Sequence, residues 1–132
     1  MTRLAKGAFE IKNWDEKPYS EMAGASKLTR ASVTKAYQGD IEGAGKLEYL
    51  MAYGHDGSAS FVGIEHFVGR VGDKHGNFVF QHVGAFKDGI AKSTWSVVPN
   101  SGSGDLKGLR GEVNSALGHA SSYTVEFSYD LE

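Results

Sequence analysis

Residues 58–98 read SASFVGIEHFVGRVGDKHGNFVFQHVGAFKDGIAKSTWSVV, and this stretch decides the fold. It predicts three consecutive antiparallel strands over Ser58–Arg70, His75–Phe86 and Ile90–Val98. The joints are short and rich in turn formers, GDKHG at 72–76 and KDGI at 87–90. Asp-Gly suits a two-residue hairpin turn, because both central residues of that turn need a positive φ. The stretch therefore predicts a series of β-hairpins.

The first joint predicts a register between its two strands. If Asp73-Lys74 is a two-residue loop, Glu65 lies directly opposite His82 on the neighbouring strand. A slip of one residue would instead place His66 beside His82. We adopt the two-residue loop and expect Glu65 and His82 to be neighbours on one face of the sheet.

The second joint extends that face to a third strand. With Asp88-Gly89 as its loop, His82 lies opposite Trp95. Because side chains alternate between faces with a period of two, one face gathers most of the aromatic residues of this region. That face holds Phe61, Phe67, Phe78, Phe80, Phe86 and Trp95, interrupted by Glu65 and His82.

The remainder of the chain supplies further strands by the same alternation of apolar and polar residues. We predict them over Lys6–Trp14, Lys27–Tyr37, Gly45–Tyr53 and Ser122–Leu131, with residues 13–26 as a long connection. Strands joined by short turns, with glycines recurring within and between them, are typical of small barrels. The sequence predicts an all-β fold, a single domain over residues 1–132 that forms an antiparallel barrel of about eight strands.

A third hairpin predicts a polar row across four strands. With His55-Asp56 as its loop, Lys46 would face Glu65, giving the row Lys46–Glu65–His82–Trp95. The opposite face would carry mostly aliphatic residues, so both faces of this wall are apolar. Such a wall usually covers its outer side with a subunit partner or with a connecting segment. We expect a homo-oligomer, a dimer or a trimer.

Composition excludes several classes of protein. The chain has 132 residues, no cysteine and a net charge of −2. It has no disulfide scaffold, no thiolate metal site and no basic footprint for nucleic acid, and no apolar run long enough for a membrane span. We expect a cytoplasmic protein without a cofactor. We do not expect a metal site either. A site formed by Glu65, His66 and His82 would need ligands from both faces of the sheet, because the alternation places His66 on the face opposite the other two. The remaining histidines fall in turns or loops: His55, His75 and His119.

The segment after Pro99 is rich in glycine, and it carries a family resemblance. A phosphate-binding loop there would need an amphipathic helix after it, but Gly108 and Gly111 interrupt any helical pattern, so we expect a bent barrel strand. VVPNSGSGDLKGLRG at 97–111, FQHVG at 80–84, KLTRA at 27–31 and EYLMAY at 48–53 resemble an uncharacterised bacterial family of small single-domain proteins, catalogued as a domain of unknown function.

That family is similar in fold to plant allene oxide cyclases, small eight-stranded barrels, and the glycine-rich segment also resembles dirigent-type barrels. The resemblance implies an oligomeric barrel that holds a hydrophobic ligand without a metal or an organic cofactor. None of the cyclases' catalytic motifs matches residue by residue, and fold alone does not establish function.

Three functions are compatible with the sequence. The first is a barrel that binds a small apolar ligand through Lys46, Glu65, Phe67, Phe80, His82 and Trp95. The second is a cofactor-independent isomerase or cyclase, with Glu65 and His82 as candidate catalytic residues that move protons in an apolar cavity. The third is a homo-oligomeric interaction protein without a small-molecule site. Glu65 and His82 could equally form a buried, hydrogen-bonded pair that only stabilises the barrel.

Overall fold

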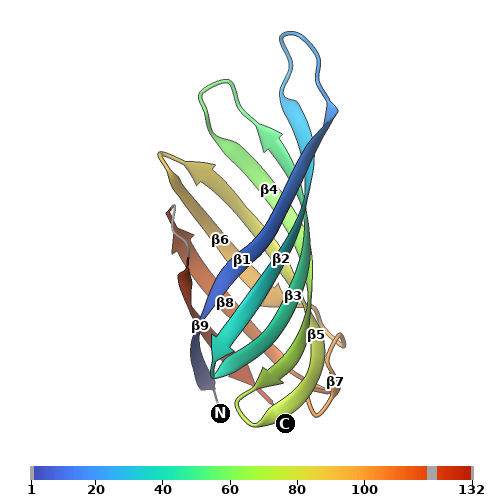
Figure 1. The fold of residues 1–132 in the computed structure, drawn as a ribbon, viewed down its shortest axis with the longest axis vertical. Coiled ribbons are helices and arrows are strands. Elements are labelled where there is room, and N and C mark those ends of the chain that lie inside the picture. Colours follow the sequence, from blue (N-terminus) through green and yellow to red (C-terminus); the bar gives the residue numbers. More distant parts are fainter. Residues whose placement is uncertain (1, 119–121, 132) are drawn as a thin grey trace.

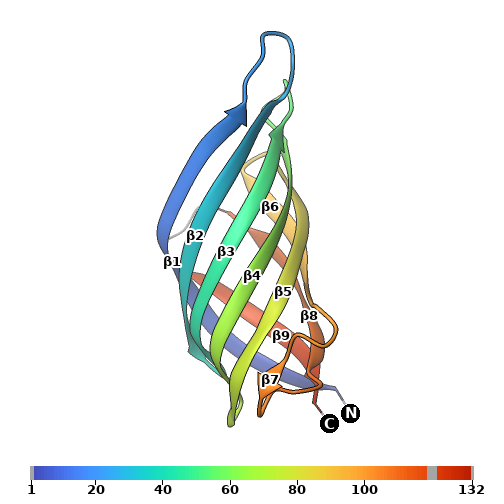
Figure 2. The same cartoon turned by 90° about the vertical axis from the view of Figure 1, so that its right-hand side faces the viewer.

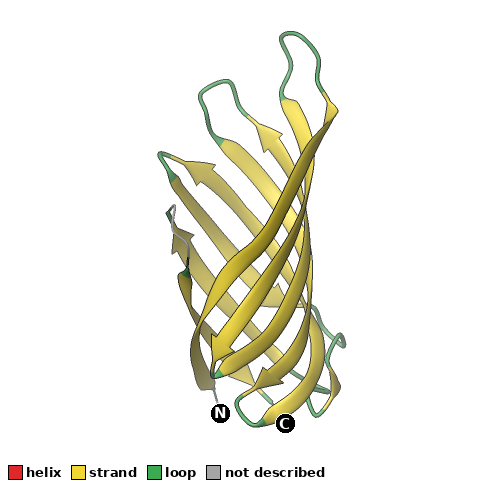
Figure 3. Cartoon of the chain, in the orientation of Figure 1, coloured by secondary structure: helices red, strands yellow, loops and turns green. Residues whose placement is uncertain are grey.

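The computed structural model describes residues 2–118 and 122–131, and all regular structure in this part of the chain is β-strand (Figure 3). The described residues therefore contain no helix that could span a membrane. The predicted all-β class is confirmed. The strands are β1 (Arg3–Ser20), β2 (Lys27–Gly39), β3 (Ile41–Tyr53), β4 (Ala59–Val71), β5 (Lys74–Lys87), β6 (Ile90–Val97), β7 (Ser103–Gly104), β8 (Arg110–Leu117) and β9 (Tyr123–Asp130).

Eight of these strands close into an antiparallel barrel. The sheet order is β4-β3-β2-β1-β9-β8-β6-β5, and β4 pairs with β5 to complete the ring. The short β7 pairs with β5 outside this ring. Both termini, β7 and the β4–β5 turn lie at one end of the barrel, which we call the terminal end (Figures 1 and 2). The loops joining β1–β2, β3–β4 and β5–β6 lie at the opposite, loop end (Figure 1).

The β5–β6 hairpin has the predicted register. Lys87 pairs with Ile90 across the Asp88-Gly89 loop, and His82 pairs with Trp95. Asp88 and Gly89 both adopt a positive φ, 54° and 79°. A two-residue turn of this kind matches the right-handed twist of its strands, and Asp-Gly tolerates its backbone. The local sequence is therefore sufficient to set this register.

The β4–β5 hairpin differs from the prediction by two residues. Val71 pairs with Lys74, so the loop is Gly72-Asp73, with Gly72 at a φ of 60°. Glu65 consequently pairs with Phe80 instead of His82. A shift of two residues preserves the face on which every side chain lies, so Glu65 and His82 still point to the same side of the sheet.

The β3–β4 hairpin differs by one residue, and this exchanges the faces of β3. The loop is His55-Asp56-Gly57, closed by a hydrogen bond from the Gly54 N–H to the Ser58 carbonyl (2.8 Å), with Gly57 at a φ of 83°. A three-residue loop commonly ends on such a left-handed residue. Leu47 therefore pairs with Glu65 inside the barrel, and Lys46 pairs with His66 outside. The predicted row containing Lys46 is wrong.

The first strand is longer than predicted and contains a bulge. Residues 13–20 continue β1 instead of forming a connection, and the register to β2 shifts between Ile11 and Asn13. A bulge inserts one residue and thereby reverses the alternation of faces beyond it. Trp14, an even-numbered residue opposite Val33, thus joins the odd-numbered Phe9 and Ile11 at the same internal cavity.

The barrel interior toward the terminal end is filled with side chains. The glycine-rich segment forms β7 and a turn, not the predicted bent strand, and it buries Leu106 and Leu109 in the core. Above them lie four phenylalanine rings with no exposed surface, Phe67, Phe78, Phe80 and Phe127. Their ring centroids are 4.8 to 5.9 Å apart along the chain of contacts from Phe67 to Phe127. We call this part of the interior the packed half.

Candidate functional site

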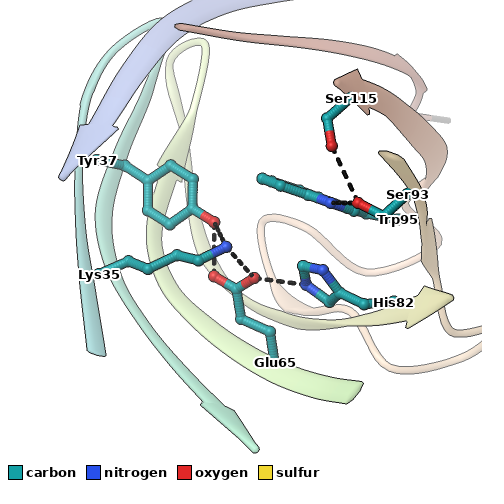
Figure 4. A network of polar contacts seen from close by, with 7 residues as sticks. All are labelled: Lys35, Tyr37, Glu65, His82, Ser93, Trp95 and Ser115. Carbon is teal, nitrogen blue, oxygen red and sulfur yellow. Dashed lines mark hydrogen bonds and ion pairs between the residues drawn. The ribbon is translucent and has the colours of Figure 1, made fainter. Parts of the chain in front are cut away.

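A buried polar network crosses the middle of the barrel. Glu65 of β4 has no exposed surface, and three side chains contact its carboxylate (Figure 4). The Lys35 Nζ lies 3.2 Å from Oε1, the Tyr37 hydroxyl donates to Oε2 at 2.6 Å, and the His82 Nε2 lies 2.7 Å from Oε1. The predicted proximity of Glu65 and His82 inside the barrel is confirmed, along a diagonal of the sheet instead of directly opposite.

The network holds Glu65 in its charged form. Burial alone would raise the pKa of this carboxyl, but the positive charge of Lys35 and the hydrogen bonds from His82 and Tyr37 outweigh it and lower the pKa to about 2. Burial and the charge of Glu65 raise the pKa of Tyr37 well above its ordinary value, so its hydroxyl keeps its proton. An ionised Glu65 and a protonated Lys35 leave the buried cluster with no net charge.

His82 is neutral and has one defined tautomer. Burial lowers the pKa of its imidazole, against the opposing hydrogen bond to Glu65. Because an ionised carboxylate only accepts hydrogen bonds, the proton is on Nε2, which donates to Glu65. The Nδ1 atom is buried without a hydrogen-bond partner among the described residues. In this tautomer Nδ1 carries a lone pair instead of an unpaired N–H.

Lys35 is the cation of the site, and sequence reasoning missed it. Its side chain is 3% exposed, and its Nζ lies 4.1 Å from the centre of the Trp95 ring and 4.5 Å from that of Phe9. Burial lowers the pKa of Lys35, while the charge of Glu65 raises it. A signal was present in the sequence: Lys35 shares its strand face with Ala31, Val33 and Tyr37, where a lysine interrupts an otherwise apolar set.

A cavity of about 440 Å³ occupies the interior between this network and the loop end of the barrel. Lys35, Trp95 and Phe9 line its inner part, while Gly89 and Gly118 mark the loop end. Apart from these, it is lined by Ile11, Trp14, Val33, Tyr49, Met51, Tyr53, Ala59, Phe61, Phe86, Ala91, Ser93, Leu117 and Tyr123. Trp14 and Phe86 are 44% and 38% exposed, so the cavity is open to solvent at its rim.

A second, smaller polar cluster organises the rim. Glu16, which the β1 bulge brings to this side, accepts hydrogen bonds from the Tyr53 hydroxyl, from Thr29 Oγ1 (2.7 Å) and from Trp14 Nε1 (3.0 Å). Burial and the hydrogen bond to Glu16 raise the pKa of Tyr53 to about 12. The cluster fixes two of the aromatic side chains that line the cavity, Trp14 and Tyr53.

The six residues predicted for a ligand site lie in four different environments. Trp95 lines the cavity, and its indole N–H donates to Ser93 Oγ at 2.9 Å (Figure 4). Glu65 and His82 lie in the network beneath it, without exposed surface. Phe67 and Phe80 belong to the packed half. Lys46 is exposed on the outer surface, because of the register of β3.

The described residues contain no group of three or more metal-ligating His, Cys, Asp or Glu side chains. His66 contacts Asn77 on the outer surface, where its Nε2 lies 3.3 Å from Oδ1. His119, one of the five histidines considered for a metal site, lies outside the described residues.

Comparison with other proteins places the chain in a family. Residues 5–129 match a family described as protein of unknown function (DUF3224). The crystal structure of a protein with unknown function from this family, from Shewanella oneidensis MR-1, is similar with a TM-score of 0.82 and 31% sequence identity, over 100% of this chain and 99% of that one. No curated protein matches. The resemblance to a bacterial family of unknown function is confirmed, while the likeness to allene oxide cyclases stays a prediction. The chain belongs to the DUF3224 family.

Proposed function

We propose that this protein binds a small apolar molecule in the cavity at the loop end of its barrel. The observation that carries the proposal is the cavity itself, about 440 Å³ in volume and lined mainly by aromatic and aliphatic side chains. Ligand sites in proteins have volumes of about 300–1,000 Å³, apolar walls and a few polar groups that orient the guest. Lys35 and Ser93 supply such groups here.

The contrast with the packed half supports a binding role. Protein interiors are filled to the density of organic crystals. The packed half of this barrel follows that rule, because its phenylalanine rings contact one another closely. The same strands could place large side chains at Ala59 and Ala91, which line the cavity, and would then fill it. Small residues at these positions keep the space free.

A fluorescent apolar probe tests the proposal. N-phenyl-1-naphthylamine should bind the wild-type protein saturably, with enhanced emission. Ala91→Phe places a ring in the cavity and should weaken binding by at least about tenfold. Ala116→Phe is the matched control, because Ala116 is exposed on the neighbouring strand β8 and should leave binding unchanged.

Urea unfolding monitored by circular dichroism shows that each variant folds. Absence of saturable binding to the wild type would contradict the proposal. Equal weakening of binding by Ala91→Phe and Ala116→Phe would also contradict it, because the probe would then not bind in the cavity.

The isomerase alternative receives less support from the geometry. Glu65 and His82 would have to contact a substrate, but both are completely buried and neither is among the described residues that line the cavity. Their hydrogen bonds are directed at one another and at Lys35 and Tyr37. This arrangement favours a stabilising role for the pair, beneath a binding cavity.

Self-association through the outer wall is a second candidate, favoured by one observation. Leu50, Val62 and Val83 form a row across β3, β4 and β5 on the outside of the barrel, and each is about half exposed. Twofold dimers are the commonest closed assemblies, and such a dimer would remove this apolar surface from solvent. We propose a homodimer that buries this face.

Light scattering at micromolar concentration tests self-association. The wild type should have the mass of a dimer, and Ile64→Glu, in the centre of the face, should convert it to a monomer. Thr124→Glu on the exposed side of β9 is the control and should remain a dimer. A monomeric wild type would contradict this proposal without affecting that of a ligand cavity.

A further inference from the structure

The described lining of the cavity combines one charged side chain with eight aromatic ones. Of the described residues that line it, Lys35 alone carries a charge, and the aromatic ones are Phe9, Trp14, Tyr49, Tyr53, Phe61, Phe86, Trp95 and Tyr123. Flat rings present faces and edges to a guest, and they favour guests that are themselves flat and unsaturated. The walls therefore select for shape, and the inner end offers a single strong donor.

Lys35 has hydrogen-bonding capacity that the protein does not use. An ammonium group has three N–H donors. Among the described residues, its Nζ has two acceptors within reach, Glu65 Oε1 at 3.2 Å and the Tyr37 hydroxyl at 3.5 Å. Its remaining surroundings include the rings of Phe9 and Trp95, both of which line the cavity. A ligand atom that accepts a hydrogen bond can use the third donor.

Charge balance restricts the kind of acceptor. Glu65 already neutralises the charge of Lys35, and its carboxylate does not line the cavity. A ligand carboxylate would add an unbalanced negative charge to a region with almost no solvent contact, which is costly. A neutral carbonyl oxygen accepts the same hydrogen bond without that cost. The 3% exposure of the lysine side chain also favours a small, weakly hydrated group.

From these observations, and resting on the proposed binding function, we infer that the cavity takes a flat unsaturated molecule ending in a neutral carbonyl. The carbonyl oxygen accepts a hydrogen bond from Nζ of Lys35. The unsaturated body lies between the rings that line the barrel. Glu65, Tyr37 and His82 hold the lysine in place and do not touch the ligand.

Three probes of nearly the same shape test this inference. In 2-acetylnaphthalene the terminal group is a ketone, in 2-isopropenylnaphthalene a CH₂ replaces the carbonyl oxygen, and 2-naphthoate carries a carboxylate. Association constants come from equilibrium dialysis against the full-length protein. The double variant Lys35→Met/Glu65→Gln removes the donor and the opposing charge together, so no buried charge is left unpaired. Lys46→Met removes an exposed lysine from the neighbouring strand as the control.

The ratio of ketone to alkene association constants should fall about tenfold from the wild type to the double variant, because a hydrogen bond to a charged donor is lost. Lys46→Met should keep the wild-type ratio. A ratio that is unchanged in the double variant would overturn the inference, and naphthoate as the tightest of the three probes would overturn the choice of a neutral acceptor. Failure of all three probes to bind the wild type would instead overturn the proposed binding function.

A measurement on the wild type alone covers the case in which the double variant does not fold. The carbonyl stretch of bound 2-acetylnaphthalene, isolated by ¹³C-edited infrared difference spectroscopy, should lie at lower frequency than in an apolar solvent, because Lys35 polarises the carbonyl. A stretch at the apolar-solvent frequency would overturn the inference.

Discussion

The two halves of the barrel interior are built from the same strands but are filled differently. Toward the terminal end, Phe67, Phe78, Phe80 and Phe127 have no exposed surface and pack ring against ring. Toward the loop end, rings such as Phe86 line a cavity of about 440 Å³ and remain partly exposed. The network of Lys35 and Glu65 lies at the boundary. The comparison indicates that one half stabilises the fold, while the other is free to bind.

Removing one partner of the buried Lys35–Glu65 ion pair should have the largest effect on stability. Lys35→Met leaves the Glu65 carboxylate buried without its counter-charge, and we expect the free energy of unfolding to fall by about 4 kcal/mol. Adding Glu65→Gln removes that charge and should restore more than half of the loss. Urea unfolding of the single and double variants measures both values. A single variant as stable as the wild type would show that the ion pair does not separate the two halves as described.

Truncating one ring in each half compares them directly. Phe80→Ala should lower the free energy of unfolding by about 3 kcal/mol, because it removes a completely buried ring from a packed core. Phe86→Ala should cost about 1 kcal/mol, since that ring is 38% exposed and borders open space. Equal losses in urea unfolding would contradict the division of the interior. Probe binding should show the reverse order. Phe86→Ala should weaken the binding of N-phenyl-1-naphthylamine, whereas Phe80→Ala should leave it unchanged.

Acid should remove the stabilising contribution of the buried network of Lys35 and Glu65, which lies between the two halves. The pKa of Glu65 is lowered from 4.5 to about 2, so the folded state binds its proton less readily than the unfolded state does. Its contribution is present above pH 4.5 and is lost as the pH falls through 2, by roughly 3 kcal/mol in total. The lowered pKa of His82 adds a loss in the same direction that begins below its ordinary value of 6.5.

The double variant Lys35→Met/Glu65→Gln isolates the contribution of Glu65. Its free energy of unfolding should lose less than that of the wild type between pH 4.5 and 2, while both share the changes from exposed carboxyl groups. Parallel pH profiles for the two proteins would contradict the assigned pKa of Glu65. His82→Phe should likewise flatten the profile just below pH 6.5.

Sequence reasoning predicted the barrel and placed Glu65 and His82 on the same interior face, because both results depend on alternation alone. The β5–β6 register followed from Asp88-Gly89, where two adjacent residues tolerate a positive φ. The β4–β5 loop was misplaced by one residue, since it is Gly72-Asp73, with Gly72 at a positive φ, instead of Asp73-Lys74. The cross-strand partner of each residue therefore shifted by two. A shift by an even number of residues keeps every side chain on its predicted face, so Glu65 and His82 were still assigned correctly to the interior.

Odd shifts account for what could not be predicted. The three-residue loop that ends at Gly57 exchanges the faces of β3, and it moved Lys46 from the predicted site to the outer surface. The bulge beyond Ile11 does the same for β1 and brings Trp14 to the cavity. Neither the loop length nor the bulge is encoded in the alternation of one strand. They depend on the pairing of neighbouring strands, as does the meeting of Lys35 with Glu65.

The two tryptophans of the chain provide the most direct test of a ligand cavity in the open half. Trp95 lies at its inner end and Trp14 at its rim, and both line it. In a ¹⁵N-labelled sample, the two indole N–H signals report on these two positions separately. Titration with N-phenyl-1-naphthylamine should shift both signals saturably, and Ala91→Phe should suppress the shift of Trp95. A Trp95 signal that stays in place at saturating probe would contradict ligand binding inside the barrel.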